Sequence, residues 1–271
     1  MSTHVQHKAT DASGDRSLVP IPPVMSTRNP LRLFGLLFVW GFSATKEMLS
    51  LILIIQVLMS VMTLLGYGLL MGDVPLPQAN FLVTGATTIS LIILGLVIVP
   101  QAVAQSKANG SLSWIRTLPV PRWIFLIADL AVYAMIALPG LILSPLVGYW
   151  RYGVSFSISW WIVLVAPLVA FMAATVGYSI ALLVQPKVAM LLSQLLVFVT
   201  LLFSPLSFPA AHMPGWLQEV HLWLPLEPMG QAIRATLMSD TFTMPTRSII
   251  VLAVWTLIAT AGGVRALNKR V

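Results

Sequence analysis

One acidic residue, Asp129, lies well inside an otherwise apolar stretch of this sequence. A carboxylate in such a position is a candidate proton or cation site, because an isolated charge is costly away from water. The alternative is a structural ion pair, for which Arg122, Lys107 or a neighbouring subunit could supply the cation. We predict the ion pair for Asp129.

The other reactive residue types are sparse and poorly grouped. The chain contains no Cys and four His, and the outer pair, His212 and His221, has no third ligand nearby. No Lys follows a Gly, so the G-x-x-x-x-G-K-[ST] phosphate loop is absent. We therefore predict no metal, no bound cofactor and no catalytic residue in this chain. An intramembrane protease or acyl transferase would need a buried Ser–His, paired-Asp or H-E-x-x-H arrangement, which the apolar stretches lack.

The chain contains six long apolar segments, one of which carries Asp129. It is 58% hydrophobic and only 8% charged. Each segment has about the twenty residues that a helix needs to cross a ~30 Å hydrocarbon layer. Helices are expected because lipid offers no hydrogen-bond partner to an open strand edge. The sequence therefore predicts an all-α membrane protein. Its predicted spans are residues 49–70, 81–103, 124–148, 158–184, 188–206 and 249–267.

The basic residues predict the orientation of these spans. Twelve of the fifteen Lys and Arg lie on one side, and Arg151, Arg234 and Arg247 lie on the other. This asymmetry places both termini in the cytoplasm. The net charge of +7 gathers at span ends, where anionic lipid head groups lie, so nucleic acid is not the expected partner. Residues 1–28 are polar and predict a disordered cytoplasmic tail before a membrane domain at 29–271.

Residues 29–46 form a further apolar stretch directly before the first span. Arg32, Gly35, Ser43 and Lys46 recur at helical spacing and give it a narrow polar stripe. This pattern predicts a helix lying along the cytoplasmic interface. The alternative, a seventh span, would invert every later loop and reverse the charge asymmetry.

Two non-spanning segments also have amphipathic character. In the longest cytoplasmic loop, Ser111 is a candidate N-cap for a short helix through Leu118, which Pro119 ends. This helix would display Trp114 and Ile115 for docking to another protein; the alternative is a loop that rests its Trp at the interface. On the outer side, residues 204–246 contain two short apolar-faced pieces, which predict a helical hairpin dipping into the outer leaflet.

Together, these features in this order resemble the membrane subunit of type-2 ABC transporters, the exporter-type permeases, from about Asn29 onwards. The resemblance implies an elbow helix, six spans, a cytoplasmic coupling helix between the second and third spans, and re-entrant helices before the sixth. The local matches are Leu112-Ser113-Trp114-Ile115-Arg116-Thr117-Leu118-Pro119-Val120-Pro121-Arg122, Ser204-Pro205-Leu206-Ser207-Phe208-Pro209, Met213-Pro214-Gly215-Trp216-Leu217, and Leu224-Pro225-Leu226 with Arg234.

The resemblance also implies partners and site residues. Two copies of a cytoplasmic ABC ATPase subunit would carry ATP and Mg²⁺, and a second permease copy or paralogue would complete a dimer within the lipids of a bacterial or archaeal plasma membrane. The ATPase-coupling residues would be Ser111, Leu112, Trp114, Ile115, Arg116, Leu118, Pro119 and Arg122. The substrate path would be lined by Gln56, Ser60, Thr63, Tyr67, Thr84, Thr88, Gln194 and Phe198. Ordinary helix packing is the alternative for these path residues.

The predicted function is ATP-driven export of an amphipathic or hydrophobic compound, such as a drug, antibiotic or natural product. Export of a lipid, glycolipid or polysaccharide by the same class of permease is the alternative. A membrane scaffold without transport activity is a more remote one.

Overall fold

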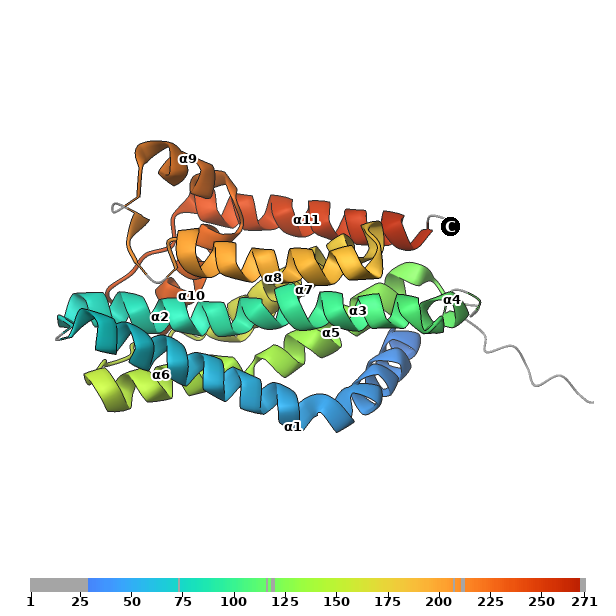
Figure 1. The fold of residues 1–271 in the computed structure, drawn as a ribbon, viewed down its shortest axis with the longest axis horizontal. Helices are drawn as coiled ribbons and strands as arrows, with labels where there is room; N and C mark the ends of the chain where they lie inside the picture. The colour runs from blue at the N-terminus through green and yellow to red at the C-terminus, as the bar shows by residue number, and fades with distance from the viewer. Residues whose placement is uncertain are drawn as a thin grey trace, which may run out of the picture.

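The computed structural model describes residues 29–72, 74–115, 117, 120–206, 208–210 and 213–268. The long helices lie side by side along the longest axis of the molecule (Figure 1). Within the described ranges, the extended pairing is a single isolated bridge between Ser157 and Met238. The predicted tail at 1–28 lies outside the described residues.

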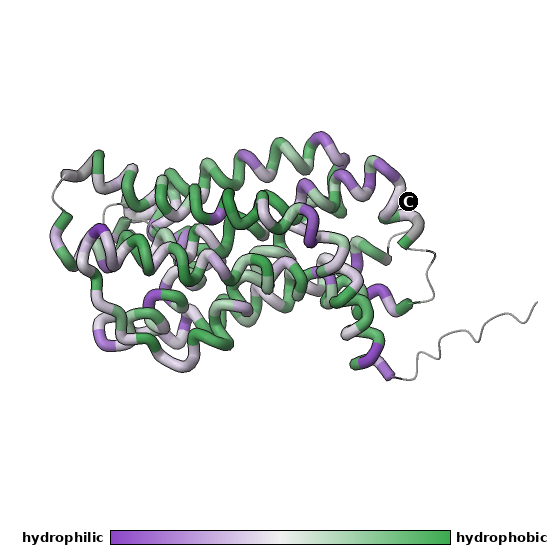
Figure 2. The backbone as a smooth tube through the Cα atoms, turned by 90° about the horizontal axis from the view of Figure 1, so that it is seen from below, coloured by the Kyte–Doolittle hydropathy of each residue, from purple (hydrophilic) through white to green (hydrophobic). Residues whose placement is uncertain are grey.

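Six helical units are long and apolar enough to cross a membrane, which confirms the all-α membrane fold. Hydrophobic residues dominate the lengths of these units (Figure 2). Three short helices complete the described chain: α4 (Ser111–Ile115), α9 (Gly215–Trp223) and α10 (Leu226–Leu237). The long units are α1 (Pro30–Met71); α2 (Leu76–Ile93), η1 (Leu94–Ile98) and α3 (Val99–Ala108) in succession; α5 (Arg122–Ala137) followed by α6 (Pro139–Tyr152); α7 (Ile162–Leu183); α8 (Pro186–Phe203); and α11 (Thr246–Asn268).

Helix α1 joins the predicted interfacial helix and the first span without interruption over 42 residues. The Asn29 side chain caps its start by accepting from the backbone N–H groups of Leu31 and Arg32. At 1.5 Å per residue α1 is about 63 Å long, twice the ~30 Å of a hydrocarbon layer. The helix bends but does not reverse direction (Figure 1). Residues 30–69 thus form a single candidate span, one of six in the described chain, rather than two. The interfacial position of the first turns stays a prediction.

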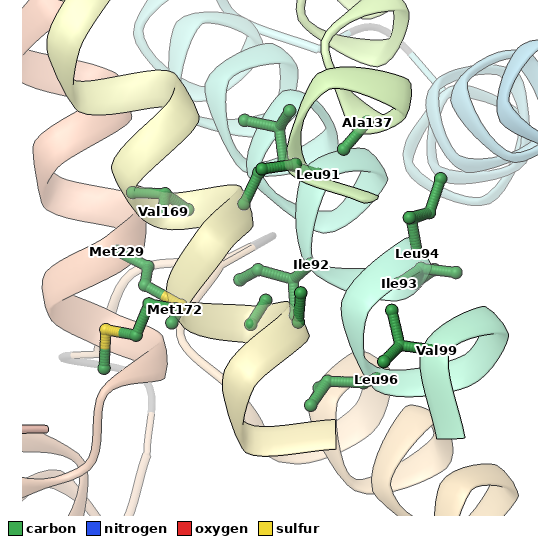
Figure 3. Close-up of a cluster of buried hydrophobic side chains, with 14 of the residues drawn as sticks. Leu91, Ile92, Ile93, Leu94, Leu96, Val99, Ala137, Val169, Met172 and Met229 are labelled. Carbon is green, nitrogen blue, oxygen red and sulfur yellow. The ribbon is translucent and has the colours of Figure 1, made fainter. Parts of the chain in front are cut away.

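The second span is the central element of the bundle, contacted by α1, α6, α7 and α10. Its apolar side chains form the middle of the core with Val169 and Met172 of α7 and Met229 of α10 (Figure 3). The span widens into the π-helix η1, where the Val99 N–H bonds to Leu94 O. Pro100 follows directly and has no N–H, so the wider turn accommodates its ring within a continuous span.

The fourth span approaches the second at two glycines. A Cβ on Gly95 would lie 2.4 Å from backbone atoms of Ala173 and Ala174, and one on Gly177 would lie 2.1 Å from Gly95 O. Only hydrogen at these positions allows α7 to touch η1 backbone to backbone.

The third span, predicted as one helix, is divided in two. Helix α5 ends at Ala137 and α6 begins at Pro139. Proline cannot donate to the carbonyl one turn earlier, so the hydrogen-bond ladder breaks there. The break leaves backbone carbonyls of α5 in need of other donors, and one of them is supplied from α1, as described below.

Helices α9 and α10 fall on the two amphipathic pieces predicted for the outer hairpin. Helix α9 stands away from the long bundle, at the opposite end from α4 (Figure 1). It is held to α11 by Trp255 Nε1, which donates to Trp223 O at 2.8 Å. Helix α10 packs against α2, α7 and α11. The depth of both helices in a membrane stays a prediction.

Candidate functional site

The predicted coupling segment contains the short helix α4. Asn109, rather than Ser111, caps it: the Asn109 Oδ1 accepts from the Ser111 N–H at 3.2 Å and from the Ser111 hydroxyl. The described helix ends at Ile115, whereas the sequence predicted a helix through Leu118. The predicted coupling residues Arg116, Leu118 and Pro119 and the side chain of Trp114 lie outside the described residues.

The apolar side of α4 packs onto its own chain. Leu112 is only 4% exposed and belongs to the hydrophobic core, and Ile115 is half-buried. Ser113 lies on the outward side and is exposed. Leu112 is therefore not accessible to a docking partner, whereas Ser113 is; a coupling role for Ile115 stays a prediction.

Two cations flank this segment, and each binds the C-terminal end of another helix. Lys107 Nζ donates to the carbonyls of Ala181, Leu182 and Val184 at 2.7–3.0 Å, at the end of α7. Arg122 Nη1 donates to Leu267 O at 3.1 Å, at the end of α11. Helix C-termini carry unpaired carbonyls and the negative end of the helix dipole, so both contacts are electrostatically favourable.

The polar face of α1 points into the protein rather than toward an open path. Gln56 is 4% exposed, and its Nε2 donates to Ile136 O at 2.8 Å, beside the break between α5 and α6. Ser60, Ser90 and Ser144 form a closed triangle of hydroxyl contacts at 2.8–3.1 Å that joins α1, α2 and α6. For Gln56 and Ser60 the structure supports the packing alternative.

The remaining predicted path residues divide between core and surface. Thr84 and Thr88 are buried, and their hydroxyls bond to carbonyls of their own helix. Thr63 and Tyr67 are half-buried. Gln194 and Phe198 are exposed on α8, so a role in lining a path stays a prediction for these two.

Asp129 makes a hydrogen bond rather than the predicted ion pair with Lys107 or Arg122. Its partner among the described residues is Tyr178 of α7. The Lys107 and Arg122 side chains instead bind the helix ends described above. Pairing with a neighbouring subunit stays a prediction. The described residues contain no group of three His, Cys, Asp or Glu that could hold a metal ion.

The burial of the charged residues on α10 was not predicted from the sequence. Arg234 is 4% exposed, lies 3.6 Å above the Phe81 ring and donates from Nη2 to Pro205 O and Leu206 O at 3.1 and 2.5 Å. Burial lowers the pKa of Arg234 to about 9, against the opposing effect of Glu227. Burial likewise raises the pKa of Glu227, whose Oε1 accepts from Gln231. The i, i+7 spacing of Glu227 and Arg234 places both residues on one face of α10. The sequence gives no indication that Arg234 binds the backbone carbonyls of Pro205 and Leu206.

The comparison with known families agrees with this arrangement. The sequence matches the family described as ABC-2 type transporter over residues 32–238. The match begins near the start of α1 and ends just after α10. It therefore includes the coupling segment, the triangle of serine hydroxyls, the charged residues of α10 and helix α8. No curated protein matches the chain.

Proposed function

The chain belongs to the ABC-2 type transporter family, and we propose that it exports an amphipathic or hydrophobic compound through a path formed with a second permease copy. It is a multi-pass membrane protein and the transmembrane component of such a transporter. The permease of this family has no ATPase site of its own, and the family implies an ABC ATPase partner. In the proposal, two ATPase copies carry ATP and Mg²⁺ on the cytoplasmic side of a bacterial or archaeal plasma membrane.

The observation that carries the proposed path is the polar Gln194 on the outer face of α8. Helix α8 contacts only the second span and α7 strongly, and its other side exposes Leu191, Leu195 and Phe198 around Gln194. A carboxamide facing lipid would leave its hydrogen-bonding groups unsatisfied, which is costly in hydrocarbon. A second copy or a water-containing path opposite α8 would satisfy Gln194. The exposed side chains around Gln194 are uncharged, which favours an amphipathic or hydrophobic cargo over an ion.

Cysteine cross-linking tests the dimer, since the natural chain has no Cys. Gln194→Cys should give a disulfide-linked dimer when membranes are oxidised. Leu146→Cys, which is 60% exposed on α6, is the matched control and should remain a monomer. Dimers from Leu146→Cys but not from Gln194→Cys would contradict the proposed interface.

A second cysteine pair tests the ATPase contact and the orientation together. Ser113→Cys on α4 and Asp240→Cys shortly after α10 are both exposed. Helices α4 and α10 lie toward opposite ends of the bundle (Figure 1). A cross-linker should join Ser113→Cys, and not Asp240→Cys, to the ATPase subunit. In intact cells a membrane-impermeant maleimide should label only Asp240→Cys. The reverse labelling would contradict the proposed topology.

Cargo class is tested with the permease and its ATPase in proteoliposomes. ATP-dependent movement of a hydrophobic dye, without movement of a fluorescent phospholipid, is the expected result. Movement of the phospholipid alone would favour the lipid-export alternative. Full transport by vesicles that lack the ATPase subunit would refute the proposal.

A further inference from the structure

A cavity of about 240 Å³ lies between the first part of α1 and helices α3, α4, α5 and α7. One water occupies about 30 Å³ in the liquid, so the cavity is several times larger than a single water site. Its walls are mainly apolar and aromatic. They include Trp40, Met48, Ile98, Leu112 and Phe125.

Asp129 is the only charged residue among the described residues that line this cavity. Tyr178 hydrogen-bonds to it, and the Tyr133 side chain lies on the same wall. The two cations that the sequence offered as partners of Asp129 bind helix ends, Lys107 at the end of α7 and Arg122 at the end of α11. Among the described residues, the cavity thus presents a carboxyl group and aromatic rings, and its lining includes no Lys or Arg.

The carboxyl group and the aromatic rings of the cavity favour some classes of ligand over others. A carboxylate in an apolar site attracts a positive charge and repels an anion. Aromatic faces add a cation–π attraction for an ammonium group and an apolar contact for a hydrocarbon chain. A bare metal ion is disfavoured, because the described residues here supply one carboxylate and no further charged ligand.

We propose that this cavity binds an amphipathic organic cation, a protonated amine whose charge meets Asp129 and whose apolar part lies among α1, α3 and α5. The site is formed within one chain and lies apart from the α8 face, so it goes beyond the transport path proposed above and does not depend on it. Because Leu112 and Ile115 also line the cavity, a bound amine contacts α4 as well.

Photoaffinity labelling of the purified full chain tests the site. The probe is a primary alkylamine with a diazirine and a chain of about ten carbons, and the matched probe is the alcohol of the same skeleton. The amine should label peptides that contain Trp40 or Asp129 about tenfold more than the alcohol does, which is the effect of one charge-assisted contact. Asp129→Asn should lower amine labelling about tenfold, to the level of the alcohol. Glu47→Gln removes an exposed carboxylate from α1, a helix that also lines the cavity, and should leave labelling unchanged.

Ala102→Phe provides a second test that keeps Asp129, because the larger side chain fills the cavity. It should abolish labelling by both probes while the chain elutes as the same species in size-exclusion chromatography. Equal labelling by amine and alcohol in the natural chain would overturn the proposal. So would amine labelling that survives Asp129→Asn or Ala102→Phe.

Discussion

Substitution of Gly177 by Ala should destabilise the bundle at the crossing of the second and fourth spans. The new Cβ would lie 2.1 Å from Gly95 O and 3.0 Å from two ring carbons of Pro100, whereas ordinary contact begins at 3.4 Å. Helix α7 must therefore move away from η1 by about 1 Å. Overpacking of this kind costs about 1–3 kcal/mol. The intrinsic gain from Gly to Ala in a helix, about 0.5–1 kcal/mol, offsets only part of that cost.

Gly66→Ala on α1 is the matched control, since a Cβ there meets nothing within 4 Å. We expect Gly177→Ala to lower the free energy of unfolding by about 1–2 kcal/mol relative to the natural chain, and Gly66→Ala to leave it equal or higher. Unfolding in mixed micelles with increasing SDS, followed by far-ultraviolet circular dichroism, measures both. A Gly177→Ala protein as stable as Gly66→Ala would refute the backbone contact between α7 and η1.

Three further predictions concern buried or bonded polar side chains. Ser90→Ala removes two hydroxyl contacts between helices and should lower the free energy of unfolding by about 1 kcal/mol, at ~0.6 kcal/mol per bond; a value unchanged in the same SDS titration would show that the triangle adds no stability. Lys107→Met leaves the last carbonyls of α7 without their donor and should cost about 2 kcal/mol, whereas the exposed control Lys46→Met should cost nothing measurable in that assay. Burial raises the pKa of Glu227 above its ordinary 4.5, so protonation of Glu227 stabilises the folded chain at low pH and this contribution is lost as the pH rises through the raised value. Glu227→Gln should therefore reduce the fall in thermal unfolding midpoint as the pH rises above 4.5, and an identical pH dependence in both proteins would contradict this reading.

Hydropathy was sufficient to predict the six spans, because each crossing needs about twenty apolar residues whatever its neighbours are. It could not predict how a span is built inside. Pro100 and Pro139 lie in equally apolar surroundings, yet the structure absorbs Pro100 in a π-turn and divides the third span at Pro139. The difference lies in the neighbours. Gly177 of α7 packs against the widened turn, whereas Gln56 of α1 supplies a donor at the break.

The polar residues show the same limit at the candidate site. Helical spacing correctly places Gln56 and Ser60 on one face of α1, but spacing contains no information on which neighbour that face meets. The face meets α2, α5 and α6 of the same chain, so it is a packing surface. Asp129 is similar: the sequence offers cations as partners, but Tyr178 from a helix about fifty residues further along makes the contact.

The attachments of Lys107 and Arg122 have a mechanical consequence. The loop between the second and third spans is anchored at both edges, on one side to the last turn of α7 and on the other to the last turn of α11. A rigid displacement of this loop must either drag those two helices with it or rupture the bonds. Force applied at one short surface segment is in this way shared among four of the six membrane crossings, namely the second, third, fourth and sixth.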